Sequence, residues 1–256
     1  MLMVVDVGNT NIVLGLFDEE RLVQSWRLTT DKSRTSDEYG ILIHELYARE
    51  RVPQGEVTAC MVSCVVPPMI PTVNEVARKF FRLEPQFVGP GIRTGMAILY
   101  DSPREVGADR IVNAVAAFEK SKRACIVVDF GTATTFDVVS SKGEYLGGAI
   151  APGVQISAEA LYLKTARLPR IEIKKPKKAI GRTTVASMQS GLYFGYVGLV
   201  VHTIAQIGKE LGRGFHVVAT GGFGAQIAAE VPGIEAYEPS LVLEGLRIVY
   251  ERNQDE

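Results

Sequence analysis

Residues 4–18, VVDVGNTNIVLGLFD, set the architecture expected for the whole chain. Two apolar runs flank a short polar turn, and the first run ends near the carboxylate of Asp6. This pattern predicts a β-hairpin, in which Gly8 lets the backbone approach a ligand closely because it has no Cβ. The turn also carries amide and hydroxyl donors that suit phosphate oxygens. Taken alone, the stretch fits an ordinary polar hairpin loop equally well.

The same plan occurs again at residues 126–139, IVVDFGTATTFDVV, where a β-branched run reaches Asp129 before a Gly-Thr turn. Residues 217–224, VVATGGFG, add a strand that runs into two glycines. Two similar hairpins in one chain are a stronger signal than either alone. They predict an α/β protein with two related lobes, which we expect at residues 1–117 and 118–256.

Hydrophobic periodicity and turn residues place the other elements. In the first lobe we expect a third strand at 21–28, a helix capped by Ser36 or Asp37, a strand at 58–66, a helix at 69–81 and a strand at 86–88. In the second lobe we expect a third strand at 144–150, helices at 154–166 and 183–211, and a final helix at 241–252. The order β-β-β-α-β-α-β predicts a mixed sheet with helices packed against it.

Composition excludes several classes of protein. The formal net charge is −1, so the chain lacks the basic footprint of a nucleic-acid-binding protein. Cys60, Cys64 and Cys125 lie in apolar stretches, which favours reduced, buried thiols in a cytosolic protein; a metal pair at the first two is the alternative. We expect no signal peptide. The uncharged segment 183–208 is interrupted by polar residues, so we expect a buried helix without a membrane span.

Residues 100–114, YDSPREVGADRIVNA, begin as a loop and become a helix near Gly107. Asp109 and Arg110 therefore lie in the first helical turn, where the helix dipole by itself favours an acidic residue. A solvated charge, or a partner for Glu105, is the plain alternative for Arg110. The segment has no evident role in the core, which makes its carboxylate a candidate functional group.

Two hairpins that each carry a carboxylate would meet the needs of phosphoryl transfer. That reaction requires a positioned polyphosphate, a metal that neutralises its charge, and a base near the attacking hydroxyl. In this interpretation the two hairpins place Asp6, Asp129 and two donor-lined turns around one polyphosphate, and Asp109 is the remaining carboxylate. The chain has no Walker loop, kinase glycine-rich loop or dinucleotide-binding fingerprint.

Several motifs together resemble the type III pantothenate kinases, a family in the superfamily of acetate and sugar kinases, Hsp70 and actin. DVGNTN, DFGTATTFD and ATGG are similar to the phosphate-1, phosphate-2 and adenosine motifs of that superfamily. The motifs typical of the family occur in order along nearly the whole chain: DVGNTN at 6–11, VSCVVP at 62–67, GADR at 107–110, DFGTATTFD at 129–137, GGAIAPG at 147–153 and GRTT at 181–184.

The resemblance implies ATP-dependent phosphorylation of pantothenate to 4'-phosphopantothenate, the first step of coenzyme A synthesis. It implies two ribonuclease H-like lobes with a nucleotide cleft between them. It further implies a cytoplasmic homodimer with a shared active site, which needs Mg²⁺ or a similar divalent metal and K⁺ or NH₄⁺. No nucleic-acid or membrane partner is expected.

The resemblance also implies roles for individual residues. Asp109 would be the general base for the substrate hydroxyl. Asp129 would hold the monovalent cation, and Asp6 would contact the divalent metal. The ATP site would comprise Asp6, Val7, Gly8, Asn9, Thr10, Asn11, Ile12, Val13, Thr132, Gly221 and Gly222. The pantothenate site would comprise Tyr100, Gly107, Ala108, Asp109 and Arg110, with Thr184 reaching in from the other subunit.

Three other functions are alternatives. A kinase of another small hydroxy compound differs only in the acceptor. An actin-like or Hsp70-like nucleotide switch is disfavoured by size, because the chain has no inserted subdomain or separate peptide-binding region. A transcriptional accessory protein is disfavoured by the near-neutral charge and by the lack of an evident DNA-binding helix pair.

Overall fold

The computed structural model describes residues 1–50 and 54–254 and separates into two compact units. Unit 1 comprises Met1–Met96, Asp101–Ala116 and Ser240–Glu256, and unit 2 comprises Ala97–Tyr100 and Ala117–Pro239. Each unit holds one five-stranded sheet, so the expected pair of α/β lobes is confirmed. The expected continuous division near residue 117 differs at the C-terminal end, because helix α7 (Leu241–Glu251) packs on the sheet of unit 1.

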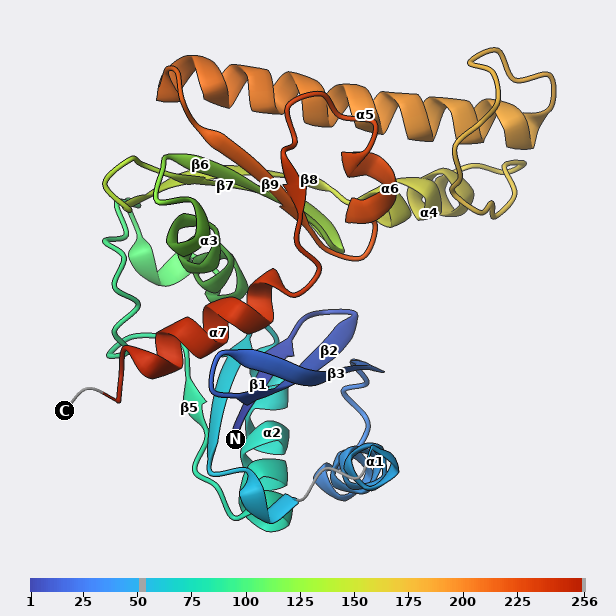
Figure 1. Cartoon of the computed structure of the whole chain (residues 1–256). Coiled ribbons are helices and arrows are strands. Elements are labelled where there is room, and N and C mark those ends of the chain that lie inside the picture. The colour runs from blue at the N-terminus through green and yellow to red at the C-terminus, as the bar shows by residue number, and fades with distance from the viewer. Residues whose placement is uncertain (51–53, 255–256) are drawn as a thin grey trace. The chain divides into compact units, whose positions relative to one another are not determined.

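The sheet of unit 1 has the strand order β3-β2-β1-β4-β5 (Figure 1). Its strands are β1 (Leu2–Val7), β2 (Asn11–Asp18), β3 (Arg21–Thr29), β4 (Ala59–Cys64) and β5 (Gln86–Phe87). The first three pair antiparallel, and β4 and β5 run parallel to β1. The mixed sheet predicted from the apolar runs is therefore confirmed.

Helices cover both faces of this sheet. Helix α1 (Ser36–Arg49), helix α2 (Ile70–Val76) and the π-helical turn Ala77–Phe81 contribute side chains to one apolar core with β1, β2 and β4. Helix α7 contacts β1, β2 and β4, and a Cβ at Gly15 would lie 3.0 Å from Leu243 Cδ1. Figure 1 shows this red C-terminal helix beside the blue N-terminal strands. The N-cap of α1 is Thr35, one residue before the expected caps, because Glu38 completes a capping box with it.

The sheet of unit 2 has the order β10-β9-β6-β7-β8, the same order as in unit 1 when read from β8 to β10. Its strands are β6 (Cys125–Phe130), β7 (Ala133–Val139), β8 (Tyr145–Pro152), β9 (His216–Thr220) and β10 (Ala236–Tyr237). Its helices are α4 (Val154–Lys164), α5 (Thr184–Leu211) and α6 (Gly224–Ala228). Helix α3 (Ala108–Ser121) begins in unit 1 and ends in unit 2. The repeated hairpins thus mark a duplicated topology.

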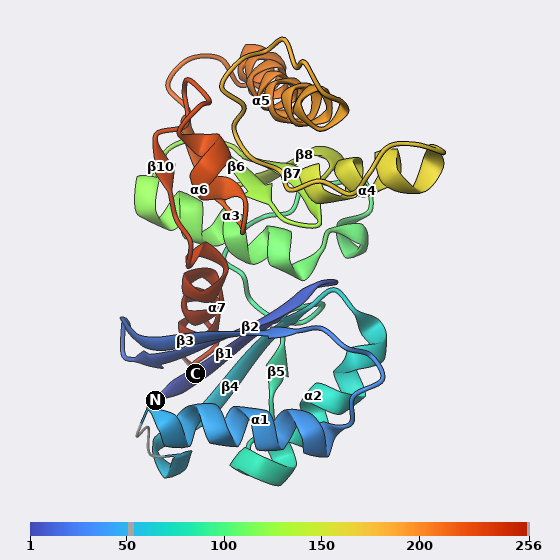
Figure 2. The same cartoon turned by 90° about the vertical axis from the view of Figure 1, so that its right-hand side faces the viewer.

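Helix α5 differs from the buried helix that the sequence predicted. Figure 2 views this long helix nearly end-on. One face, which includes Met188, Tyr193, Tyr196, Val200 and Ile204, is buried in the core of unit 2. The opposite face is exposed, since Gly191, Gly195 and Gly198 each have nothing within 4 Å of an added Cβ. By length and composition alone α5 could cross a membrane, but a core helix of a soluble protein passes the same test.

Candidate functional site

The first hairpin turn is closed by backbone bonds and anchored by a neighbouring strand. The Gly8 N–H donates to the Asn11 carbonyl at 3.0 Å. Thr30, just after β3, donates its hydroxyl to the Gly8 carbonyl at 2.7 Å and its N–H to the Thr10 carbonyl at 2.9 Å. Asn9 and Thr10 are exposed at the tip. Thr30 was missed by sequence reasoning, and only its position beyond the β2–β3 pairing could have pointed to it.

The residues of this turn divide by burial into two groups. Val7 and Ile12 are 0% and 4% exposed and belong to the core of unit 1, so only their backbone can face a nucleotide. Asp6, Gly8, Asn11 and Val13 are half-buried. The turn therefore presents a carboxylate, backbone amides and polar side chains where β1 and β2 meet. The amides and polar side chains can donate to phosphate oxygens, and the carboxylate can bind a divalent metal.

The GADR segment places Asp109 in the first turn of α3. The Arg110 N–H donates to Asp109 Oδ1 at 2.8 Å. Burial raises the pKa of the Asp109 carboxyl, and the N–H bond and charge of Arg110 oppose that shift. A Cβ at Gly107 would lie 2.5 Å from Asp109 Oδ1, so glycine leaves the space that the carboxylate occupies. A carboxylate with a raised pKa is a better proton acceptor than an ordinary aspartate.

The second hairpin turn brings Asp129 and Gly221 together. These residues lie at the ends of the paired strands β6 and β9. A Cβ at Gly221 would lie 2.4 Å from Asp129 Oδ1, and the φ of Gly221 is +89°, so both space and backbone favour glycine there. Gly222 is exposed beside it. Asp129 of the second hairpin and the TGG turn therefore lie side by side within unit 2.

The start of helix α4 lies directly against the same turn. The Gly153 N–H donates to the Thr132 carbonyl at 3.2 Å, and a Cβ at Gly153 would lie 2.3 Å from that oxygen. Thr132 itself is exposed, and the Gly131 N–H donates to the Ala133 carbonyl at 3.1 Å. The GGAIAPG motif thus ends where its glycine allows a helix to approach the phosphate-2 turn closely.

Tyr100 is held in unit 2 by the edge of its sheet. Residues 97–99 pair with Tyr145, which donates its N–H to the Ala97 carbonyl and accepts from the Leu99 N–H, both at 2.8 Å. The rings of Tyr100 and Tyr145 are 6.4 Å apart. The Tyr145 hydroxyl donates to the buried Asp137 at 2.7 Å, so the support under Tyr100 is rigid. Asp137 and Tyr145 were not singled out from the sequence.

Thr184 is the first residue of α5 and is exposed. The preceding Thr183 accepts the Ala186 N–H as N-cap, at 3.1 Å. Thr184 therefore lies at the surface of unit 2.

The cysteines do not form a metal site in the described residues. Among residues 1–50 and 54–254, no three His, Cys, Asp or Glu side chains cluster as metal ligands. Burial raises the pKa of the Cys60 and Cys125 thiols to about 12, and Cys64 donates to the Val66 carbonyl.

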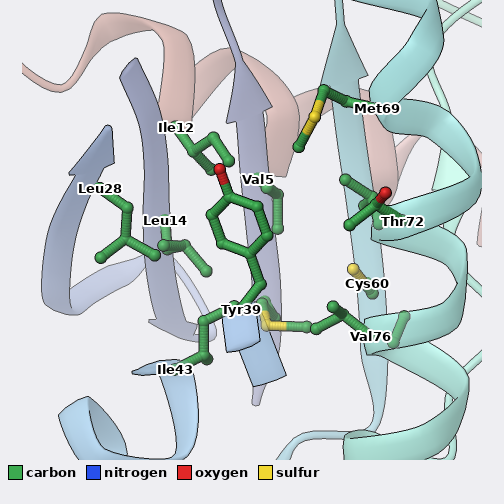
Figure 3. A pocket seen from close by; sticks show the side chains of 13 residues that line it. Val5, Ile12, Leu14, Leu28, Tyr39, Ile43, Cys60, Met69, Thr72 and Val76 are labelled. Carbon is green, nitrogen blue, oxygen red and sulfur yellow. The ribbon is translucent and has the colours of Figure 1, made fainter. Parts of the chain in front are cut away.

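An apolar cavity of about 30 Å³ lies between the sheet of unit 1 and helices α1 and α2. Figure 3 shows Val5, Ile12, Cys60 and Val76 around it, with the Tyr39 ring among them. Its lining is almost entirely carbon and sulfur, so it cannot satisfy a polyphosphate. It is a packing defect behind the first hairpin and does not belong to the nucleotide site.

Comparison with known proteins assigns the family. A family model described as type III pantothenate kinase matches residues 2–206. The chain is similar to the type III pantothenate kinase of Geobacter sulfurreducens, with 55% identity over 255 residues and 100% of both chains. It is also 54% identical over 253 residues to that of Myxococcus xanthus, covering 99% of each chain.

Solved structures of lower identity show the fold. A Campylobacter jejuni protein titled a conserved putative Baf family transcriptional activator aligns with a TM-score of 0.62 at 18% identity, covering 99% of this chain and 100% of that one. A putative 2-dehydro-3-deoxygalactonokinase from Sinorhizobium meliloti aligns with a TM-score of 0.60 at 11% identity, covering 100% of both. With motifs, topology and full-length similarity in agreement, this chain belongs to the type III pantothenate kinase family.

Proposed function

We propose that this protein transfers the γ-phosphoryl group of ATP to the hydroxyl of pantothenate, giving 4'-phosphopantothenate and ADP in the first step of coenzyme A synthesis. The observation that carries the proposal is membership of the family over the whole chain, at 55% identity to a type III pantothenate kinase. The motifs that carry the chemistry lie inside the matched region or within unit 2 beside it.

Asp109 is the general base in this proposal. The substrate hydroxyl oxygen attacks the γ-phosphorus, the bond to the β-bridging oxygen breaks, and the hydroxyl proton passes to the Asp109 carboxylate. Burial and a raised pKa support the role, because proton transfer improves as the pKa of the base approaches the working pH. Arg110, Gly107, Ala108 and Tyr100 would line the acceptor site.

The two hairpin turns would bind the nucleotide. In unit 1 the backbone from Asp6 to Val13 would meet phosphate oxygens, and in unit 2 Thr132, Gly221 and Gly222 would meet the phosphates and adenosine. Mg²⁺, held by Asp6 and the phosphates, would neutralise charge that develops on the transferred group. K⁺ or NH₄⁺ would sit at Asp129. Gly221 packs closely against that carboxylate, which supports a small cation site with no room for larger groups.

We further propose a homodimer that buries the exposed face of α5. Phe194 and Val185 are 40% and 42% exposed on this helix, and its three open glycines would let a second copy approach closely. A two-fold partner offers the same face in return. Thr184 of the partner subunit would then complete each pantothenate site. The three cysteines are free thiols, which supports our proposal that the protein works in the reducing cytoplasm.

Dependence of ATP turnover on pantothenate tests the reaction. Purified protein with Mg²⁺ and K⁺ should release ADP only when pantothenate is present, and a panel of hydroxy acids and sugars should give far lower rates. Preference for another acceptor would make the protein a kinase of that compound. Turnover that ignores every acceptor would favour the nucleotide switch.

Mixed dimers test the shared site. Asp109→Asn and Thr184→Arg subunits should each be inactive, but their mixture should recover part of the activity, because one site in each mixed dimer keeps both native residues. Sedimentation would establish the dimer, and tagged subunits would establish exchange. A monomer at assay concentration, or no recovery after exchange, would refute the shared site.

A further inference from the structure

We propose that Tyr196, a residue on α5 outside every recognised motif, positions the phosphate-2 turn for nucleotide and cation binding. The proposal deepens the proposed function and rests on it. It concerns the hydroxyl group of a buried side chain whose neighbours come from three different elements of unit 2. Tyr196 would act through these neighbours and would not touch substrate.

The Tyr196 hydroxyl joins β7 to α5. It shares a hydrogen bond with Thr134 Oγ1 on β7, in which either hydroxyl can donate. Val154, the first residue of α4, belongs to the same core cluster as Tyr196. Tyr196 is 6% exposed and Thr134 is 0% exposed, so water does not compete for this bond.

Each contact of Tyr196 lies next to a residue of the proposed site. Thr134 follows Thr132 by two residues on the strand that leaves the turn. Val154 follows Gly153, whose N–H bonds the Thr132 carbonyl. The Tyr196 ring packs against Phe130, the neighbour of Asp129, with centroids 6.1 Å apart. The turn between Asp129 and Thr132 is thus held from both of its strands and from the adjoining helix.

Electrostatics agree with this placement. Burial raises the pKa of Tyr196, the hydrogen bond with Thr134 opposes that shift, and the negative charge of Asp129 adds to the rise. The tyrosine therefore stays neutral and can keep its proton in the bond to Thr134. The Tyr196 hydroxyl therefore interacts electrostatically with Asp129, the carboxylate proposed to hold the monovalent cation.

Removal of this hydroxyl should loosen the turn. The buried Thr134 hydroxyl would lose its partner, and such a group shifts to find another. A site that binds phosphate and a cation needs its donors held within about 0.5 Å. The loss should therefore appear as weaker ligand binding, while the packing of the ring in the core is kept.

The test uses Tyr196→Phe, with Tyr193→Phe as its matched control. Tyr193 is also buried on α5, and its hydroxyl donates to the Gln226 carbonyl on α6 at 3.4 Å, not to Thr134. Calorimetry with a non-hydrolysable ATP analogue, and titration of its binding with KCl, need no acceptor. Tyr196→Phe should weaken analogue affinity and raise the K⁺ concentration for half-saturation by about tenfold, and the control should match wild type.

Thr134 variants separate positioning from stability. Thr134→Val should reproduce the defect of Tyr196→Phe, Thr134→Ser should restore binding, and the double variant should be no worse than either single variant, because all remove one shared bond. If Tyr196→Phe fails to fold, the valine and serine variants decide. Equal binding by those two, or Tyr196→Phe binding within about twofold of its control, would overturn the proposal. If the wild-type protein binds the ATP analogue but does not phosphorylate pantothenate, only the proposed reaction is refuted, and the binding test of Tyr196 still holds.

Discussion

The two hairpin turns share one topology but carry different chemical groups. The turn of unit 1 is anchored by Thr30, just after β3, and its tip exposes amide and hydroxyl side chains. The turn of unit 2 is enclosed by the start of α4 and by the Gly221 turn, which pack against Thr132 and Asp129. The two turns of this duplicated topology are therefore supported in different ways.

The helices that cover the two sheets also differ in how closely they pack behind the hairpins. In unit 1, α1 and α2 leave a small apolar cavity behind the hairpin. In unit 2, the buried face of α5 reaches the turn itself through Tyr196. In the proposed function the general base belongs to unit 1, and the cation and its support belong to unit 2. The predictions below test that division.

Asp109→Asn should have the largest effect. Loss of a general base should lower kcat by about 10²–10⁴-fold, with ATP analogue binding and the circular dichroism spectrum unchanged. Glu105→Gln, an exposed carboxylate four residues earlier, is the control and should keep normal turnover. Activity within a few-fold of wild type would show that Asp109 of unit 1 is not the general base.

Asp129→Asn should raise the K⁺ concentration for half-maximal activity by about 10–100-fold, because a neutral amide binds a cation less well than a carboxylate. In wild type, exchange of K⁺ for a bulky organic cation at constant ionic strength should abolish turnover. Undiminished rates in that medium would show that unit 2 holds no required monovalent cation.

The carboxyl of Asp109 should titrate above the ordinary aspartate pKa of about 3.9, because burial penalises its charged form. The rate should therefore fall as pH falls through this raised pKa. The difference between ¹³C NMR titrations of wild type and Asp109→Asn, with labelled aspartate, measures the value directly. A midpoint at or below the ordinary value would contradict the burial argument.

The same raised pKa predicts a stability signature. A carboxyl whose pKa is higher in the folded state favours folding below its unfolded pKa, and that contribution is lost as pH rises through the folded pKa. Asp109→Asn should thus keep or raise Tm at neutral pH, although it removes activity. A lowered Tm at neutral pH would mean that the ionised carboxylate stabilises unit 1.

The smallest effect concerns the cavity. Val76→Ile adds one methyl group to the lining of the cavity in unit 1 and should stabilise the protein by about 0.5–1 kcal/mol, seen as a Tm rise of a few degrees. Val200→Ile, on the fully packed face of α5, should lower Tm instead, because it overfills the core. Equal shifts would mean that both units pack alike.

Local patterns in the sequence determined much of this protein. Both hairpins, the strands after them and the helix that begins at GADR followed from apolar periodicity and from glycine and carboxylate positions, because these signals act over a few residues. The family resemblance was confirmed by the full-length relatives.

Tertiary structure alone decided the rest. The return of α7 to the sheet of unit 1, the anchor at Thr30 and the bond between Tyr196 and Thr134 join residues far apart in the chain. Which face of α5 is buried was also decided only by the core, since its apolar residues are spread around the helix. Short-range patterns cannot specify such contacts, because each depends on which surfaces the assembled sheets leave to be covered.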